Sequence, residues 1–215
     1  MMKNGVTFGS RHSIDDWDLL MTSKDIGEAE PRTNYVDIEG RDGSIDLTEA
    51  LGEVKYNDRT LSFEFDLFNP VDFWKTKQSI SNYLNGRKMQ IILDQDPMYY
   101  YNGRCVNISA TREKNLAQFS IEFTCEPYKM MISKTIVSKN VKPKDKIILS
   151  NQRKTVMPKV SSTGDIVFKF GDKQFNLGLT DSFLSPDFIL KEGENEIEII
   201  SGTGTLTFTY REGSL

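Results

Sequence analysis

The residues best suited to chemistry lie in the stretch "GRDGSIDLTEAL", where carboxylate and hydroxyl side chains surround a glycine. A calcium-binding loop needs oxygen ligands at positions 1, 3, 5 and 12, and a glycine at position 6 for its sharp turn. A loop that begins at Asp42 supplies the four oxygen positions through Asp42, Ser44, Asp46 and Glu53. Leu47 occupies the glycine position, however, and no flanking helices are evident. The pattern therefore favours a hairpin or extended arm that turns at Asp42-Gly43, since Asp-Gly readily supplies a positive φ.

A second acidic pair, Asp94 and Asp96, follows an apolar run and is followed directly by Pro97. Such a D-x-D pair can hold a divalent metal in a nucleotide-sugar transferase, but those enzymes need an α/β nucleotide-binding scaffold. The pair therefore favours a turn closed by Pro97. His12 is the only histidine, so we expect it at the surface rather than in a zinc site or as a general base.

The sequence contains no G-x-S-x-G, P-loop or Rossmann fingerprint. Its glycine pairs, in "GDKQFNLG" and "SGTGT", lie between strand-like segments without the helix that would bind phosphate. The sequence therefore predicts that the protein is not an enzyme, with no catalytic, cofactor-binding or metal-binding residues and no cofactor. A hydrolase that works through acidic residues or a metal is a weaker alternative.

Apolar residues alternate with polar ones along most of the chain, as Leu61, Phe63, Phe65 and Leu67 do, which is typical of strands with one buried face. One segment differs, because Pro70 can open a helix and Gly86 can end one. We predict a mainly β protein with a single helix over about 70–85.

Two cysteines lie in one predicted hairpin, Cys105 in its first strand and Cys125 in its second. Strict alternation places Val106 on the core face and Cys105 on the opposite face, whereas Cys125 lies on the core side of its own strand. The two side chains should point to different sides of the sheet, and a disulfide would need a bulge. We predict two reduced thiols.

The balance of basic and acidic residues changes near Lys134. Residues 1–133 carry 15 basic and 21 acidic side chains, and residues 134–215 carry 12 and 10. Eight basic residues and one acidic residue lie between Lys134 and Lys159. We interpret this stretch as a solvated linker. A nucleic-acid patch is less favoured, because aromatic residues for base stacking are lacking. We expect a domain over 1–133 and a small antiparallel sandwich over 134–215.

The N-terminus lacks the apolar core of a secretory signal and no apolar run is long enough for a membrane span, so we expect cytoplasmic synthesis and no membrane partner.

The order of several segments resembles the distal tail protein (Dit) family of siphophages and prophages, which have long, non-contractile tails and infect Gram-positive bacteria. The segments are spread along the chain, so that the resemblance extends over nearly all of it, and they are "PRTNYVDIEGRDGSIDLTEALGEVKYNDRTLSFEFDL", "LNGRKMQIILDQDPMYYYNGRC", "FTCEPYK", "GENEIEI" and "YREGSL". The resemblance implies an N-terminal β-sandwich with one α-helix and an extended hairpin arm, followed by a C-terminal galectin-like β-sandwich.

The resemblance also implies a virion structural protein at the tail tip. Six copies would form a homo-hexameric ring, a baseplate hub through which DNA passes, without specific nucleic-acid binding. The ring would join the tail tube protein to the tail-associated or tail fibre protein and the receptor-binding proteins. Residues 1–133 would form the ring and 134–215 would be a docking domain. The subunit interface would include the arm residues Arg41, Asp42, Gly43, Ser44 and Asp46, with Arg41 able to form two hydrogen bonds with a carboxylate of the next subunit.

A different class of function is a carbohydrate-binding adhesin that recognises host cell-wall sugars through the second domain. Sugar sites need exposed aromatic rings beside amide and carboxylate groups. From residue 134 onward there is no Trp, and Tyr210 is the only Tyr, which favours the hub.

We predict that calcium does not stabilise the protein, because Leu47 stands where a calcium loop needs glycine. A genuine site at a calcium concentration 100 times its Kd would raise the free energy of unfolding by about 2.7 kcal/mol. Melting followed by circular dichroism should give the same Tm in excess calcium and in excess chelator. A Tm that falls on chelation would show that the loop binds calcium.

Overall fold

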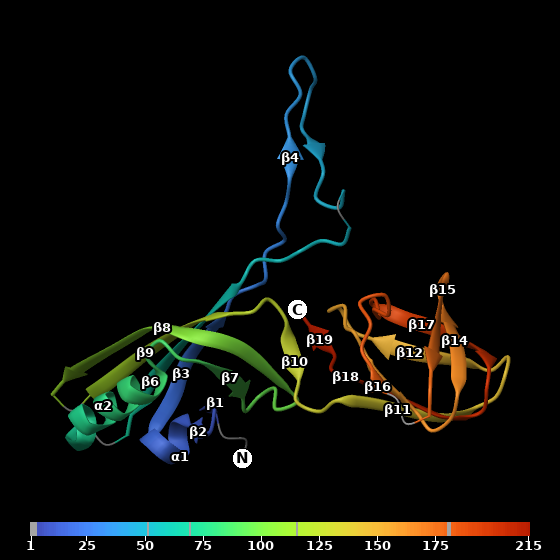
Figure 1. Ribbon diagram of the computed structural model, residues 1–215. Coiled ribbons are helices and arrows are strands. Elements are labelled where there is room, and N and C mark those ends of the chain that lie inside the picture. Colours follow the sequence, from blue (N-terminus) through green and yellow to red (C-terminus); the bar gives the residue numbers. More distant parts are fainter. Residues whose placement is uncertain (1–3, 51, 69, 115, 180–181) are drawn as a thin grey trace. The chain divides into compact units, whose positions relative to one another are not determined.

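The computed structural model describes residues 4–50, 52–68, 70–114, 116–179 and 182–215 (Figure 1). The chain divides into two compact units, Met1–Lys129 and Met130–Leu215, called unit 1 and unit 2 below. Each unit has its own hydrophobic core.

Unit 1 is built on an antiparallel sheet whose strands follow the order β2-β1-β7-β8-β9-β6-β3. The buried and exposed residues of β6 alternate as its sequence predicts. The strands are β1 (Val6–Phe8), β2 (Arg11–His12), β3 (Leu19–Ile26), β6 (Arg59–Leu67), β7 (Lys88–Leu93), β8 (Tyr99–Glu113) and β9 (Leu116–Cys125), with β4 (Tyr35–Val36) and β5 (Ile45–Asp46) forming a separate pair between β3 and β6, and β10 (Lys129–Met131) following β9.

The sheet of unit 1 curls over its own apolar face. In the strand order, β1 lies three steps from β9, which would separate the two strands by about 14 Å in a flat sheet. The rings of Phe8 on β1 and Phe123 on β9 nevertheless stack at 5.3 Å. Phe8 also lies 5.8 Å from Phe63 on β6. The curled sheet thereby closes the predicted N-terminal sandwich around one aromatic core, and the mainly β fold class is confirmed.

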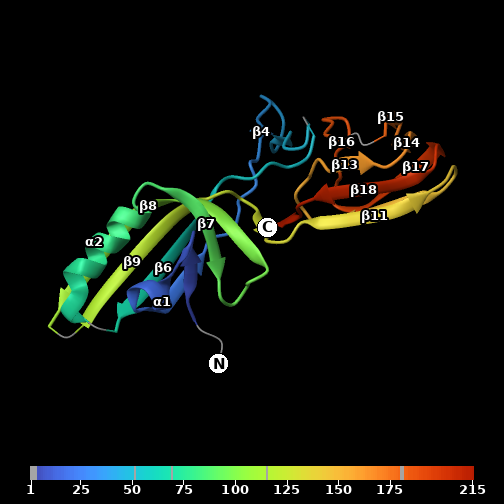
Figure 2. The same cartoon turned by 60° about the horizontal axis from the view of Figure 1, so that its bottom comes forward.

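The predicted helix is confirmed as the 3-10 turn η1 (Pro70–Asp72) followed by α2 (Phe73–Leu84). It buries Phe73 and Leu84, and Gly86 follows it with φ +69°. Phe73 packs 5.6 Å from Phe119, consistent with the place of α2 beside β8 and β9 in two views (Figures 1 and 2). The structure adds a one-turn helix, α1 (Ser13–Trp17), which the sequence did not predict.

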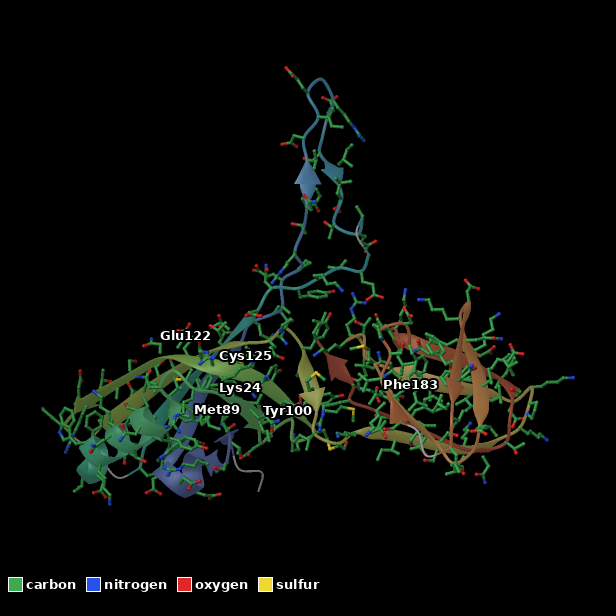
Figure 3. The ribbon with its side chains drawn as sticks, viewed as in Figure 1. Lys24, Met89, Tyr100, Glu122, Cys125 and Phe183 are labelled. Carbon is green, nitrogen blue, oxygen red and sulfur yellow. The ribbon has the colours of Figure 1, made fainter. Side chains whose placement is uncertain are left out.

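The cysteines are free thiols, as predicted, but the predicted faces were wrong. The pairing of β8 with β9 shifts between Cys105 and Asn107, so Val106 forms a bulge and is 49% exposed. This bulge puts the Cys105 side chain into the same core as Cys125, which is labelled in Figure 3. Cys105 lies opposite Phe123 and Cys125 lies opposite Gly103, so the two thiols are not directly paired.

Unit 2 is a sandwich of two antiparallel sheets, and its inner faces meet through Phe168 of one sheet and Phe208 of the other, 6.2 Å apart. One sheet has the order β11-β18-β13-β16 and the other β12-β17-β14-β15. The strands are β11 (Thr135–Val141), β12 (Lys146–Asn151), β13 (Lys159–Ser162), β14 (Ile166–Phe170), β15 (Lys173–Leu177), β16 (Ser182–Phe183), β17 (Gly193–Ser201) and β18 (Gly204–Tyr210), followed by the short β19 (Gly213–Ser214).

The interpretation of residues 134–159 as a linker was wrong, because this basic stretch forms β11 and β12 and reaches the start of β13. In β12 the buried positions Ile147 and Leu149 alternate with exposed ones. Lys146 is one of the exposed residues, and its Nζ lies 2.7 Å from Glu196 Oε1 on the neighbouring strand. Lys139, Lys146 and Lys159 are thus exposed residues of strands, and the stretch is part of the sandwich. In the described part of the chain, no helix has the length and apolar character to cross a bilayer.

We predict that Phe123→Ala lowers the free energy of unfolding of unit 1 by about 3–5 kcal/mol, because it opens a cavity in a fully buried aromatic cluster. Tryptophan fluorescence during urea unfolding isolates this unit, since Trp17 and Trp74 are the only tryptophans and both belong to it. Thr124→Ala, at an exposed position of the same strand, is the control and should stay within about 0.5 kcal/mol of wild type. Equal midpoints for the two variants would contradict the closure of the sheet around Phe123.

Candidate functional site

The extended arm, residues 31–56, belongs to unit 1; it leaves the sheet of that unit after β3 and returns to it at β6 (Figure 1). At its root the Gly27 N–H donates to the Thr60 carbonyl oxygen at 2.9 Å. A Cβ on Gly27 would lie 2.9 Å from that same oxygen, so the close approach of the two strands requires glycine. The next backbone bond joins the Asn57 N–H to the Glu30 carbonyl oxygen at 2.8 Å.

Arg59 is a buried basic residue that ties the root together. Its Nε donates to the Gly27 carbonyl oxygen at 2.7 Å, and Nη2 lies 3.3 Å from Glu28 Oε2. Its guanidinium lies 5.7 Å from the centre of the Tyr101 ring, and burial raises the pKa of Tyr101. The guanidinium thus has a carbonyl oxygen, a carboxylate and an aromatic face as partners.

Farther out, the arm is a two-stranded ladder. The Arg32 N–H donates to the Lys55 carbonyl oxygen at 2.7 Å, and the Leu47 N–H donates to the Asn34 carbonyl oxygen at 2.7 Å. Between these bonds and the tip, β4 pairs with β5, with Val36 opposite Ile45. From 31 to 50, every residue is exposed except the half-buried Ile45 and Thr48.

The tip is a turn in which the Arg41 N–H donates to the Ile38 carbonyl oxygen at 3.2 Å. Gly40 has φ +81° and Gly43 has φ +74°, which are values that side chains other than glycine rarely adopt. The Asp42-Gly43 dipeptide therefore lies in the loop as expected, but the hydrogen-bonded turn comes before it and spans Ile38 to Arg41, with Gly40 inside it.

The structure divides the five predicted interface residues into two groups. Arg41, Asp42 and Gly43 are exposed at the tip. Ser44 and Asp46 instead have partners inside the arm, since Ser44 Oγ donates to Asp37 Oδ1 at 2.6 Å and Asp46 Oδ1 accepts from the Thr48 N–H at 2.9 Å. Hydrogen bonds from the side chain and backbone of Thr48 hold the pKa of Asp46 below its usual value. No group of three His, Cys, Asp or Glu residues suited to a metal ion occurs in the part of the chain that the structure describes.

The other candidate residues have structural partners. Asp94 accepts from the Gly5 N–H at 3.0 Å and lies 3.2 Å from His12 Nε2, whereas Asp96 pairs with Lys129 Nζ at 2.9 Å. Their two carboxylates are thus engaged with different groups. His12 is not the surface residue that we expected, because its side chain is 14% exposed. It caps α1, because its Nδ1 accepts a hydrogen bond from the Asp15 N–H. No sequence motif predicts this role.

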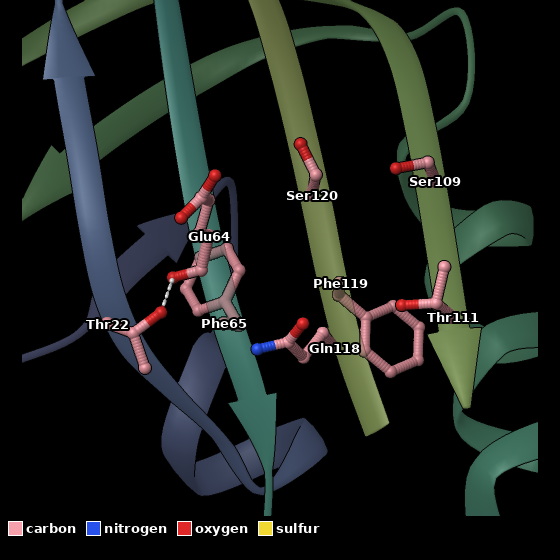
Figure 4. A pocket seen from close by; sticks show the side chains of 8 residues that line it. All are labelled: Thr22, Glu64, Phe65, Ser109, Thr111, Gln118, Phe119 and Ser120. Carbon is pink, nitrogen blue, oxygen red and sulfur yellow. Dashed lines mark hydrogen bonds between the residues drawn. The ribbon is translucent and has the colours of Figure 1, made fainter. Parts of the chain in front are cut away.

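A shallow hollow of about 150 Å³ lies on the outer face of the unit 1 sheet (Figure 4). Its exposed lining is hydroxyl, amide and carboxylate, and Thr22 Oγ1 donates to the Glu64 carbonyl oxygen at 3.2 Å. The lining residues are Thr22, Glu64, Phe65, Ser109, Thr111, Gln118, Phe119 and Ser120. This set contains neither histidine nor cysteine, so its hydroxyls have no imidazole or thiol beside them.

The described residues form a curled β unit with a long exposed arm, followed by a β-sandwich. Residues 17–125 match the family model described as the phage tail protein RIFT-related domain, so the chain belongs to this family of phage tail proteins. The resemblance to siphophage distal tail proteins found in the sequence is therefore confirmed.

Among solved structures, the fold is similar to that of the Dit protein (gp 19.1) of phage SPP1, described as a paradigm of the hub adsorption apparatus in phages that infect Gram-positive bacteria. The TM-score is 0.71 at 13% sequence identity, and the match covers 96% of this chain and 98% of the SPP1 chain. No curated protein sequence matches the chain.

We predict that trypsin cuts the native protein first within the arm, after Arg32, Arg41 or Lys55, because exposed and locally unfoldable segments are cleaved before buried ones. Cleavage after Arg59 should be much slower, since its side chain is buried at the root. Mass spectrometry of the earliest fragments identifies the site. A first cut after Arg59, or within the core strands of unit 1, would contradict the exposed state of the arm.

Proposed function

We propose that the protein is the hub of a siphophage tail tip, in which six copies form a ring that joins the tail tube to the adhesion apparatus. The observation that carries this proposal is the fold match to a hub protein over nearly the full length of both chains. The exposed arm supports it, because a closed ring uses heterologous contacts in which one surface of a subunit meets a different surface of the next.

Residues 1–133 form the ring in this proposal, and residues 134–215 form the docking domain. The first region contains the arm, α2 and both tryptophans, and large aromatic side chains favour subunit contacts because they bury much area at low entropic cost. Arg41 and Asp42 are the tip residues available to a neighbouring subunit, whereas Ser44 and Asp46 hold the arm in shape.

The partners of such a ring are the tail tube protein on one side and the tail-associated or tail fibre protein and receptor-binding proteins on the other. The ring is assembled after synthesis in the bacterial host cytoplasm and ends up at the virion tail tip. DNA passes through it without specific binding, which the excess of six acidic side chains in residues 1–133 favours, since clustered lysines would retain phosphate. The hub carries out no catalysis.

The alternative, a carbohydrate-binding adhesin, has less support from unit 2. Its only tyrosine, Tyr210, is 4% exposed, and its hydroxyl donates to the Ser150 carbonyl oxygen at 2.6 Å. Burial raises the pKa of this hydroxyl as well. Every aromatic ring of unit 2 is buried or half-buried in the core, so a platform for stacking a sugar is lacking there.

We predict that deleting Gly40 to Thr48 leaves folded monomers, whereas a chain truncated after Met131 still forms the oligomer. The reason is that the arm belongs to unit 1 and the truncation removes only unit 2. Light scattering at several concentrations measures the mass of each variant, and circular dichroism checks that strand content is retained. If the truncated chain is a stable monomer while the arm deletion assembles, the ring interface lies in the other unit.

A further inference from the structure

Unit 2 has an open edge strand, β11. It pairs with β18 over seven consecutive positions without a register shift, from Thr135 opposite Tyr210 to Val141 opposite Gly204. In the described part of the chain no other strand pairs with β11, and Figure 2 shows it along the border of the unit. An edge strand presents a row of backbone N–H and C=O groups that can pair with another extended chain.

The other long edge strands are interrupted or capped. In unit 1, the pairing of β3 with β6 shifts between Met21 and Ser23, and the Met21 carbonyl oxygen accepts from Asn4 Nδ2 at 3.1 Å. In β12, the edge of the second sheet of unit 2, the Ser150 carbonyl oxygen accepts from the Tyr210 hydroxyl at 2.6 Å. Bulges and covered backbone groups discourage a second chain from pairing. Among the residues that the structure describes, no side chain bonds to the backbone of β11 in this way.

The one charged side chain of β11 lies at a core-facing position. Val137 packs against the core of unit 2, and Val141 is 6% exposed. Because side chains alternate with a period of two, Lys139 lies on the same side as these valines, opposite the fully buried Leu206. Lys139 is nevertheless exposed, so its aliphatic stem passes the free edge and its ammonium group lies in water there.

Lys139 opposes pairing with a second copy of β11. Two copies paired antiparallel about Ser138 would place the two Lys139 side chains diagonally on one face, about 7–8 Å apart. Like charges at this separation repel, and the flanks add to the repulsion, because residues 134–144 contain four lysines and no acidic residue. The edge is therefore open to an extended chain but guarded against its own copy.

Charge identifies the chemistry of the segment that fits. The exposed lysines around the free edge are Lys134, Lys139, Lys142 and Lys144. Two carboxylates at the ends of the strand already have partners, since Asp145 Oδ2 accepts from the Lys142 N–H at 3.0 Å and Glu212 Oε1 accepts from Thr135 Oγ1 at 2.6 Å. An incoming strand with acidic side chains complements this edge, because oppositely charged cross-strand pairs stabilise a sheet.

The outer face beside the edge favours a polypeptide over a nucleic acid. Ser138 Oγ and Thr207 Oγ1 lie 2.8 Å apart, and Thr205 Oγ1 donates to Asn140 Oδ1 at 2.6 Å. These uncharged side chains satisfy one another, and every described aromatic ring of unit 2 is buried or half-buried, so none is exposed for base stacking. The backbone of β11 is what remains to offer hydrogen bonds, and a second strand matches its spacing.

We propose that an extended, acidic segment of another tail protein adds to β11 as a further strand, with a carboxylate beside Lys139. In this mode of recognition, main-chain hydrogen bonds provide the affinity and the side chains opposite provide the selection. The proposal deepens the docking role of residues 134–215 and rests on the proposed function, because it names the edge that receives the partner and the chemistry of the segment.

Two synthetic peptides test the edge on the full-length protein. One alternates threonine and valine around a central glutamate, and the other has lysine in place of the glutamate. At about 1 mM, the glutamate peptide should slow hydrogen–deuterium exchange in residues 135–141, measured by mass spectrometry, and leave exchange in β3 unchanged. It should bind about tenfold more tightly than the lysine peptide, because the lysine peptide brings a like charge to Lys139.

Two charge-reversal variants locate the selection. Lys139→Glu should invert the preference, so that the lysine peptide binds more tightly. Lys159→Glu is the matched control, since it makes the same change at an exposed position of β13, two strands from β11 in the same sheet, and it should keep the preference for glutamate. Circular dichroism checks that both variants retain their strand content.

The inference is wrong if neither peptide slows exchange in residues 135–141, or if Lys139→Glu and Lys159→Glu show the same preference. It is also wrong if single-stranded DNA protects these residues and the peptides do not. Light scattering on the same samples tests the ring separately. A ring that forms while no peptide binds overturns the edge alone, whereas a chain that is monomeric at every concentration and still binds the glutamate peptide overturns the ring alone.

Discussion

The contact on which the fold of unit 1 depends is the stacking of Phe8 on Phe123, because it forces a continuous sheet to curl until strands far apart in the hydrogen-bonding order share one core. Once Phe8 is fixed there, Trp17 packs beside it at 6.3 Å, and the chain enters β3 at a defined place. Strand β3 then pairs with β6, and their common end is the root of the arm. A protrusion that makes few contacts of its own is thereby mounted on the paired ends of β3 and β6.

The root shows how polar chemistry is used to position the arm. A buried arginine is costly unless its donors are satisfied, and Arg59 meets this condition by bonding to the Gly27 carbonyl oxygen and to Glu28. Both partners directly follow β3 on the outgoing side of the arm, whereas Arg59 is the first residue of β6 on the returning side. The same bonds that make the burial of Arg59 tolerable therefore join the two strands where they leave the sheet. Gly27 adds a steric requirement, since any side chain there would press on the Thr60 carbonyl group.

Much of this architecture could be predicted from the sequence where a pattern is long. The alternation from Leu61 to Leu67 predicted β6, and Pro70 and Gly86 marked the ends of the helix. Short or local features were not predicted from the sequence. Three residues are too few for alternation to reveal β1, and one inserted residue, Val106, reversed the predicted side of Cys105. The many lysines of residues 134–159 obscured the alternation of β11 and β12, because these strands bury few apolar side chains.

Magnitudes separate the two kinds of side chain that the arm would bring to a protein contact in the proposed hub. An exposed ion pair contributes about 0–1 kcal/mol, so Arg41 and Asp42 at the tip would add little to the strength of such a contact. Fully burying a Val, Leu or Ile side chain contributes about 1.5–3 kcal/mol. Val36 is 40% exposed, Ile38 48% and Leu47 38%, so covering them would contribute more than the tip charges do, even though part of the gain is offset by the entropy of ordering the arm. In the proposed hub these aliphatic side chains would supply the strength of a contact and the tip charges its register, because a misplaced charge costs more than a well-placed one contributes.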